Sequence, residues 1–382
     1  MKYDKKIAPI IFYVFGIINS FGLFLYSYTQ VDLNLTLSRI SVWQTIQKAF
    51  QSIGYFHRPV SLVLFLGILF LLFFWYGLTL YFISKKKLGA THIWIMIFCM
   101  TGILIFAYPA FSYDLFNHMF TAKTVLLYQK NPYEVTPLQF TGFESWLTFM
   151  HWTHVVSIYS PLWIVMTLVP YLFGFGYFLW ILWNFKLLIA AFYALTCYSI
   201  LNILQREDDS LALSGMAMFA FNPLVIIESL VSAHNDSVMM GCAVFALYLF
   251  TRQRTVLSFF TLSVSIAMKL ISVFLIPIYL FGKVRWLPLV LMATGTFGFL
   301  LFTKREVMPW YFLWTLPFIA LYPRKKWLIA LTFGISLGLL LRYAPYLYYG
   351  HWNDPVPLIK LWVTGVPIAA SGVLALIERK RY

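Results

Sequence analysis

Asp114 is the first residue of this chain whose position suggests chemistry. It follows a run of apolar residues long enough to cross a membrane, and His118 and Glu134 come after it in the same polar segment. A carboxylate at the edge of a bilayer is costly to keep there, so such residues are candidates for function. Asp114 could accept a proton from a substrate hydroxyl as a general base, or it could cap the helix that begins at Leu115. The sequence leaves both roles open.

A second polar cluster closes the apolar segment 211–229. Glu228 is followed closely by His234, Asn235 and Asp236. A metal site needs His and carboxylate ligands that converge, and His234 and Asp236 are only two positions apart. The residues could also cap the next helix. We interpret them as a polar network that orients a substrate, and the sequence gives no support for a metal cofactor.

Two cations lie within apolar segments. Lys269 separates two short apolar stretches, and a buried ammonium group needs an anionic partner. Asp114, Glu228 and Asp236 are the candidates within the chain, and a phosphate group of a substrate is another. Arg342 lies near one end of an apolar segment, where it could bind a phosphate with two parallel hydrogen bonds or extend its side chain to the membrane surface.

The composition assigns the chain to the polytopic membrane proteins. Of its 382 residues, 61% are hydrophobic and 11% are charged, whereas a soluble domain is about half apolar and a quarter charged. The formal net charge is +15, but the basic residues form short clusters between apolar segments. This placement indicates cytoplasmic loops next to a lipid bilayer and not a nucleic-acid partner. The three cysteines lie in apolar segments, so no disulfide is predicted.

The basic clusters predict about twelve spans, with both termini in the cytoplasm. The segment 161–176 is shorter than the ~20 residues of a crossing helix, and a crossing there would turn the later basic clusters outward. We therefore expect it to be re-entrant or to lie at the surface. The expected spans are 7–28, 60–83, 92–112, 177–203, 211–229, 237–251, 255–268, 270–282, 286–302, 310–322, 327–346 and 357–377.

The chain is predicted to form one membrane domain over 1–382. Residues 1–89 supply two N-terminal spans, 90–350 form a core, and 351–382 supply the last span. Most carboxylates and six of the seven histidines are expected on the outer side, where the long loop 113–158 also lies. No nucleotide-binding glycine motif is present. We therefore expect the chemistry at the outer surface, with a substrate that arrives through the lipid phase.

An ordered set of short motifs resembles the GT-C superfamily of polytopic glycosyltransferases, with the spacing most similar to bacterial mannosyltransferase-like proteins that depend on polyprenol phosphate. The resemblance covers about residues 90–350 and implies an all-α GT-C-like bundle with surface helices in a long extracytoplasmic loop. The motifs are Tyr113-Asp114, Asn131-Pro132-Tyr133, Tyr159-Ser160-Pro161-Leu162-Trp163, Asn222-Pro223 with Glu228 and His234-Asn235-Asp236, Lys269 with Pro277, Pro309-Trp310-Tyr311, and Arg342.

The resemblance implies transfer of a hexose such as mannose from a polyprenyl-phosphate sugar to a lipid or glycan acceptor, with inversion and with Asp114 as the general base. Members often carry a second acidic residue beside the base, which is absent here, so metal assistance is not expected. The predicted location is the plasma membrane. The predicted substrate-binding residues are Tyr113, His118, Tyr133, Glu134, Tyr159, Glu228, His234, Asn235, Asp236, Lys269, Trp310, Tyr311 and Arg342.

Two other classes of membrane protein remain open. A secondary transporter would have about twelve spans and broken helices, although one half of this chain does not repeat in the other. A flippase that moves or binds lipid-linked glycans would also have an outward polar segment. A flippase would keep its activity after Asp114→Asn, whereas the enzyme would not.

Overall fold

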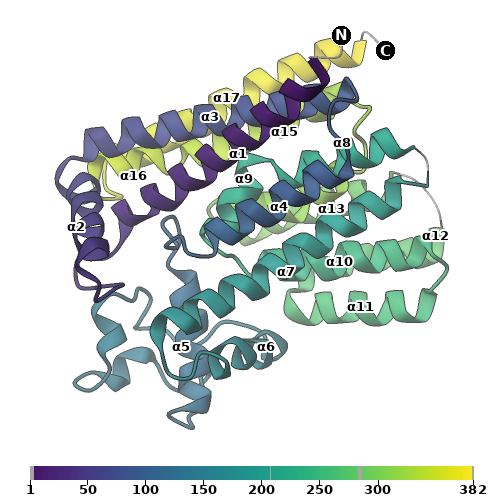
Figure 1. The fold of residues 1–382 in the computed structure, drawn as a ribbon. Coiled ribbons are helices and arrows are strands. Elements are labelled where there is room, and N and C mark those ends of the chain that lie inside the picture. Colours follow the sequence, from purple (N-terminus) through teal and green to yellow (C-terminus); the bar gives the residue numbers. More distant parts are fainter. Residues whose placement is uncertain (1–3, 207, 283–285, 381–382) are drawn as a thin grey trace.

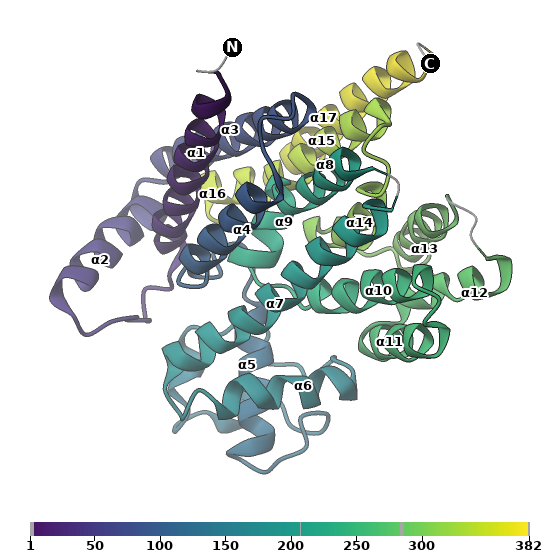
Figure 2. The same cartoon turned by 45° about the vertical axis from the view of Figure 1, so that its right-hand side comes forward.

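Helices make up the ordered structure of this protein. We describe a computed structural model of residues 4–206, 208–282 and 286–380, and these residues form no β-strand. Helix α1 begins and helix α17 ends at the same end of the molecule, while α5 and α6 lie at the opposite end (Figure 1 and Figure 2). Helix α5 therefore lies at the opposite end of the molecule from the start of α1 and the end of α17.

Five helical segments among the described residues are long and apolar enough to cross a membrane. Each has at least 24 residues, which at 1.5 Å per residue exceeds the hydrocarbon thickness of a bilayer. These segments are α1 (Asp4–Ser27), α3 (Arg58–Ser84), α7 (Phe178–Leu204), the pair α15 (Lys326–Leu341) and α16 (Ala344–Tyr349), and α17 (Val356–Lys380).

The remaining expected spans are shorter or broken. Helix α8 (Asp209–Ala220) and the segment Pro223–Val231 meet at a bend of 49°, because Pro223 lacks an N–H and disfavours helix at the residue before it. Counted as one, this pair gives a sixth span. The other short helices are α4 (Ala90–Leu104), α9 (Pro223–Val225), α10 (Asp236–Thr251), α11 (Thr255–Met268), α12 (Pro277–Phe281), α13 (Leu287–Thr303) and α14 (Leu316–Ile319).

The segment that follows α4 carries short helices instead of a crossing. The expected third span, 92–112, ends early at Leu104, and α5 (Asp114–Leu126) begins after an irregular turn. Helix α6 (Pro161–Leu172) has 12 residues, about 18 Å, which is too short to cross alone. Helix α2 (Ser41–Phe56) lies between the first two expected spans, 7–28 and 60–83, where no crossing is expected.

Helices α15 and α17 pack closely through glycines. A Cβ atom at Gly338 would lie 2.4 Å from the carbonyl oxygen of Thr364, and one at Gly334 would lie 2.2 Å from the Ser371 side chain. Small residues allow such close approach between membrane helices. The contact brings Arg342, directly after α15, next to the first half of α17.

Candidate active site

Asp114 lies at the first position of α5 with its carboxylate 33% exposed. The N-cap residue of α5 is Tyr113, and its side chain makes no capping bond, so the capping role considered for Asp114 is not observed. The backbone N–H of Asp114 donates to the Ser112 hydroxyl at 3.3 Å. The N-terminal end of a helix carries a partial positive charge that stabilises an anion, so this position suits a carboxylate.

A buried histidine links Asp114 to a second carboxylate. His234 Nδ1 lies 3.8 Å from Asp114 Oδ2, and His234 Nε2 lies 3.2 Å from Glu228 Oε2. The Tyr343 hydroxyl donates to Glu228 Oε1 at 2.9 Å. Glu228 and His234 are almost completely buried, whereas Asp114 reaches solvent. Of the four residues expected to form one polar network, Glu228 and His234 are joined and reach Asp114, whereas Asp236 has other partners.

The backbone around His234 is unusual. Glu228 lies in a π-helical turn, Ile226–Val231, a form that is rare and frequent at functional sites. Ala233 has a φ of +58°, a left-handed conformation that is uncommon for a residue other than glycine. The imidazole of His234 stacks on the Trp310 ring at 4.2 Å between centroids. This backbone geometry and the Trp310 ring together fix the orientation of His234.

Lys269 pairs with Asp236. Its ammonium nitrogen lies 2.7 and 2.8 Å from the two carboxylate oxygens, and the Trp314 indole N–H also donates to Asp236. Asp236 is one of the carboxylates that the sequence offered as a partner for Lys269, and it is the one that Lys269 contacts. Lys269 lines neither of the two cavities beside Asp114, so its predicted contact with a substrate phosphate is not supported by its position.

We expect Lys269→Met to destabilise the folded protein. The Asp236 side chain is 1% exposed, and removal of one partner from a buried ion pair costs about 3–5 kcal/mol because the other charge is left without compensation. Thermal unfolding in detergent should show a lower midpoint for this variant. Asp236→Asn in the same background should recover part of the loss. An unchanged midpoint for Lys269→Met would contradict a structural role.

The larger cavity beside Asp114 has a volume of about 490 Å³ and is lined by three cations. Arg58 comes from the start of α3, Arg342 from the end of α15, and Lys360 from α17. Cations that converge on one cavity suit an anionic group such as a phosphate. Tyr113, Trp310 and Tyr343 also line this cavity.

A carboxylate lies between two of these cations. Glu306 Oε1 is 2.5 Å from the Arg342 guanidinium and forms an ion pair with Lys360. Arg342 Nη1 also donates to the Thr364 hydroxyl at 3.4 Å. The Arg342 side chain is 11% exposed, so it faces the cavity and does not extend to the surface. Arg342 therefore has a partner that the sequence alone did not reveal.

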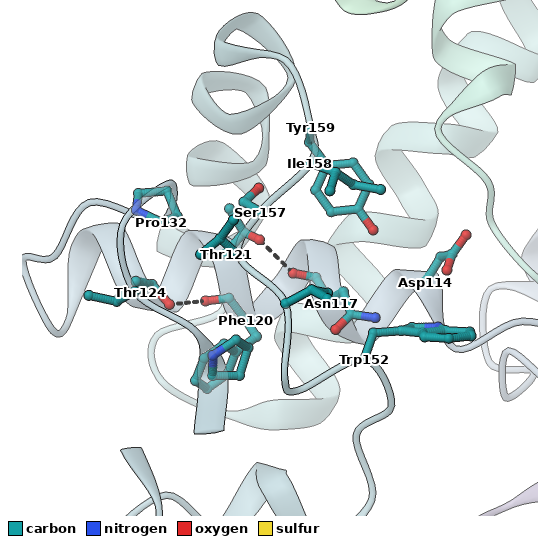
Figure 3. Close-up of a pocket in the computed structure, with 14 residues that line it drawn as sticks. Asp114, Asn117, Phe120, Thr121, Thr124, Pro132, Trp152, Ser157, Ile158 and Tyr159 are labelled. Carbon is teal, nitrogen blue, oxygen red and sulfur yellow. Dashed lines mark hydrogen bonds between the residues drawn. The ribbon is translucent and has the colours of Figure 1, made fainter. Parts of the chain in front are cut away.

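A smaller cavity of about 290 Å³ lies on the other side of Asp114 (Figure 3). The α5 side chains Asn117 and Thr121 line it, and Trp152 and Tyr159 come from the loop that precedes α6. Asp114 and Trp152 line both cavities. Asp114 thus lines two cavities that differ in charge. The larger cavity has three cations in its lining, and the described lining of the smaller cavity has none.

The other predicted site residues lie around these cavities. Tyr113 stacks on His151 at 3.9 Å. His118 is buried and accepts a hydrogen bond from the Trp163 indole at 3.0 Å. Burial, and then the charges of Lys269 and His234, hold the pKa of His118 well below its ordinary value. His118 thus supports the Tyr159 side of the smaller cavity, since their rings lie 4.2 Å apart.

Nine of the predicted residues line neither cavity. Five of them are residues already described, His118, Glu228, His234, Asp236 and Lys269, and the other four are Tyr133, Glu134, Tyr311 and Asn235. The Tyr133 hydroxyl donates to the carbonyl oxygen of Tyr159 at 2.6 Å. Glu134 accepts from the Asn131 amide at 2.7 Å. Tyr311 packs among the rings of Phe299, Trp310 and Trp314, and the buried Asn235 precedes α10. These residues shape the surrounding structure.

Sequence reasoning missed three charged residues of the larger cavity as site residues: Arg58, Glu306 and Lys360. Arg58 and Lys360 each lie near the start of a long apolar helix, where basic residues are commonly placed at the membrane surface. Arg58 and Lys360 both stand at the predicted outer end of a span, whereas Lys and Arg are usually concentrated at the cytoplasmic end. This exception was the signal in the sequence that could have identified them.

No metal centre is evident in the described part of the chain. Among these residues, no group of three His, Cys, Asp or Glu side chains is arranged to hold a metal ion. The expectation that the reaction needs no metal stays a prediction.

The apolar helices define a helical membrane protein with a partly exposed carboxylate beside two cavities, and comparison with known families specifies the class further. Residues 13–285, more than half of the chain, match the family described as "Alpha-(1->6)-mannopyranosyltransferase, N-terminal domain". The chain therefore belongs to this family and is a glycosyltransferase of the mannosyl-transferring type. This confirms the resemblance to GT-C mannosyltransferase-like membrane proteins. No curated protein and no solved structure matches the chain.

Proposed function

We propose that this protein transfers a mannosyl residue from a polyprenyl-phosphate sugar to a lipid or glycan acceptor at the extracytoplasmic face of the plasma membrane. The observation that carries this proposal is the position of Asp114. Its carboxylate is partly exposed and lines both a cavity with three cations and a cavity with none among its described lining residues. A base between a phosphate site and an acceptor site is the arrangement that an inverting transfer requires.

In the proposed reaction, Asp114 takes the proton of the acceptor hydroxyl as that oxygen attacks the anomeric carbon. The bond between the anomeric carbon and the phosphate oxygen breaks, and polyprenyl phosphate leaves with the bonding electrons. His234 lies 3.8 Å from the carboxylate and orients it from the buried side. Attack opposite to the leaving group inverts the anomeric configuration.

The cations of the larger cavity would stabilise the leaving phosphate. Arg58, Arg342 and Lys360 supply three positive charges, against the two carboxylates, Glu306 and Asp114, that line the same cavity. Negative charge develops on the leaving group in the transition state, so cations placed there accelerate the reaction. The prenyl chain would extend into the surrounding lipid.

The proposed orientation places both termini in the cytoplasm, with about twelve spans once the shorter helices are counted. Helices of 14–17 residues, such as α11 and α13, would cross with tilt or with local thinning of the bilayer. The common end of α1 and α17, opposite α5 and α6 (Figure 1), supports termini on one side.

Single cysteines test this orientation. In a background without Cys99, Cys197 and Cys242, we expect cysteines at Gln139 and at Lys325, which are both exposed, to react with a membrane-impermeant thiol reagent from opposite sides. Gln139 should react in intact cells, and Lys325 should react only after permeabilisation. Reaction of both from the same side would contradict the proposed topology.

The donor is tested with purified protein and two alternative substrates. Polyprenyl-phosphate mannose should support transfer to a glycan or lipid acceptor, and a nucleotide sugar alone should not. Transfer from the nucleotide sugar without any lipid-linked intermediate would refute the proposed donor.

A further inference from the structure

We propose that the smaller cavity is the acceptor subsite and that it takes an uncharged sugar residue whose hydroxyl faces Asp114. Nothing in the family match assigns this cavity a role. The inference rests on the proposed function, since it assumes that Asp114 is the base. The proposed function does not say which cavity holds the acceptor. The inference assigns the acceptor to the smaller cavity, names the residues that recognise it and predicts that it is uncharged there.

The first observation is the difference in charge between the two cavities. The described residues that line the smaller cavity include no Lys, Arg or His, and Asp114 is their only carboxylate. An acceptor with a phosphate in this space would meet the carboxylate and no cation to offset it. At about 290 Å³, the cavity is at the low end of the size range of ligand sites. A single neutral sugar residue fits both properties.

The second observation is a row of polar side chains on one face of α5. Asp114, Asn117, Thr121 and Thr124 are spaced three or four residues apart, which places them on the same side of a helix, and all four line the cavity (Figure 3). The Thr121 hydroxyl donates to the Asn117 carbonyl oxygen at 2.8 Å. Its oxygen therefore remains able to accept a hydrogen bond from a sugar hydroxyl.

The Asn117 amide is not committed to another part of the protein. It makes no side-chain hydrogen bond to any residue that the structure describes, and it extends from α5 toward the space beside Trp152 (Figure 3). An amide offers both donors and an acceptor, which matches the mixed character of sugar hydroxyls. Asn117 lies one helical turn from Asp114, so it can orient the residue that Asp114 deprotonates.

Ser157 belongs to the loop that lines the same cavity. Its hydroxyl oxygen is buried and has no hydrogen-bond partner within the described chain. Its backbone N–H donates to the carbonyl oxygen of Pro132 at 2.9 Å, which fixes the residue at the cavity wall. Because its hydroxyl oxygen has almost no accessible surface, Ser157 shapes the cavity wall and is not counted among the groups that would contact the sugar.

Two aromatic rings complete the subsite. Trp152 lines both cavities and has a φ of +59°, a rare conformation for a bulky residue that is found at functional sites. The Tyr159 hydroxyl is directed toward the Asp114 side of the cavity (Figure 3). Burial, and then the charges of Asp114 and Asp236, hold the pKa of Tyr159 well above its ordinary value. Tyr159 therefore keeps its proton as a donor.

The test combines equilibrium binding with transfer kinetics. The neutral probe is octyl α-mannopyranoside and the charged probe is phosphatidylinositol, both presented in the same detergent. The variants are Asn117→Leu, Thr121→Val and their combination. The control is Thr261→Val on α11, where the threonine hydroxyl makes the same bond to a helix carbonyl away from both cavities.

We expect the wild type to bind octyl α-mannopyranoside and to use it as an acceptor, and to discriminate against phosphatidylinositol. The double variant should weaken binding of the mannoside by roughly tenfold or more, the effect of losing two neutral hydrogen bonds. The KM for polyprenyl-phosphate mannose should not change. Thr261→Val should behave as wild type.

Two results would overturn the acceptor subsite. One is unchanged mannoside binding in the double variant, and the other is equal use of phosphatidylinositol and the mannoside. Because binding is measured without the donor, these results differ from a failure of the proposed function. That failure would appear as normal mannoside binding with no transfer from polyprenyl-phosphate mannose.

Discussion

Asp114→Asn should reduce the rate of mannosyl transfer by about 10²–10⁴-fold, the usual contribution of a general base. The substitution keeps the size of the side chain and removes its ability to accept a proton. The carboxylate makes no capping bond in α5, so the fold should survive. The measurement is the initial rate of transfer from polyprenyl-phosphate mannose by purified protein, together with the thermal unfolding midpoint.

Asp209→Asn provides the matched control for this prediction. Asp209 is also an aspartate in the first turn of a helix, α8, and it lies away from both cavities. Asp209→Asn and Asp114→Asn therefore both remove a favourable interaction with the positive end of a helix dipole. Only Asp114→Asn also removes the proposed base. A near-normal transfer rate in Asp114→Asn would refute its catalytic role and would favour the flippase interpretation.

Arg342→Gln should weaken use of the polyprenyl-phosphate donor. Hydrogen bonds to charged groups contribute about 1.5–3 kcal/mol, so kcat/KM for the donor should fall roughly 10- to 150-fold while the KM for the acceptor changes little. Arg342→Lys should also be impaired, because an ammonium group cannot make two parallel contacts with a phosphate. Arg324→Gln is the control, since Arg324 forms an exposed ion pair with Asp208.

Glu306→Gln should have the opposite effect on the donor. Glu306 pairs with both Arg342 and Lys360, so its charge competes with a phosphate for the same two cations. Its side chain is 45% exposed, and removal of this competition should lower the donor KM by roughly fivefold, equivalent to about 1 kcal/mol. A higher donor KM in this variant would show that Glu306 positions the cations for the phosphate instead of competing with it.

The sequence predicted the helical fold and much of the site because the relevant signals were local. Long apolar runs define α1, α3 and α7, and the start of α5 at Asp114 follows from the change from apolar to polar residues. The cluster that contains Glu228 and His234 is visible as a rare concentration of polar side chains beside an apolar segment. Such features depend on residues that are close together in the chain.

The interactions that the sequence could not predict join distant residues. Lys269 and Asp236 are 33 positions apart, and Arg342 and Glu306 are 36 apart. Each pairing depends on how short helices pack, which hydrophobic periodicity does not specify. The number of full crossings could not be settled either, because a helix of 12–17 residues can cross with tilt or lie against other helices.

Gly334 and Gly338 let α15 pack closely against α17. This packing brings together Arg342, directly after α15, and Lys360, in α17, which are both near the C-terminal end of the sequence. Asp114, His234 and the whole smaller cavity lie within the matched residues 13–285, whereas Glu306, Arg342 and Lys360 lie outside them. The proposed base and most of the cationic charge proposed to bind the donor phosphate are therefore encoded in separate, consecutive stretches of the chain. Under this proposal, a relative could alter its affinity for the donor phosphate through changes in the C-terminal helices alone and keep the same base and the same acceptor pocket.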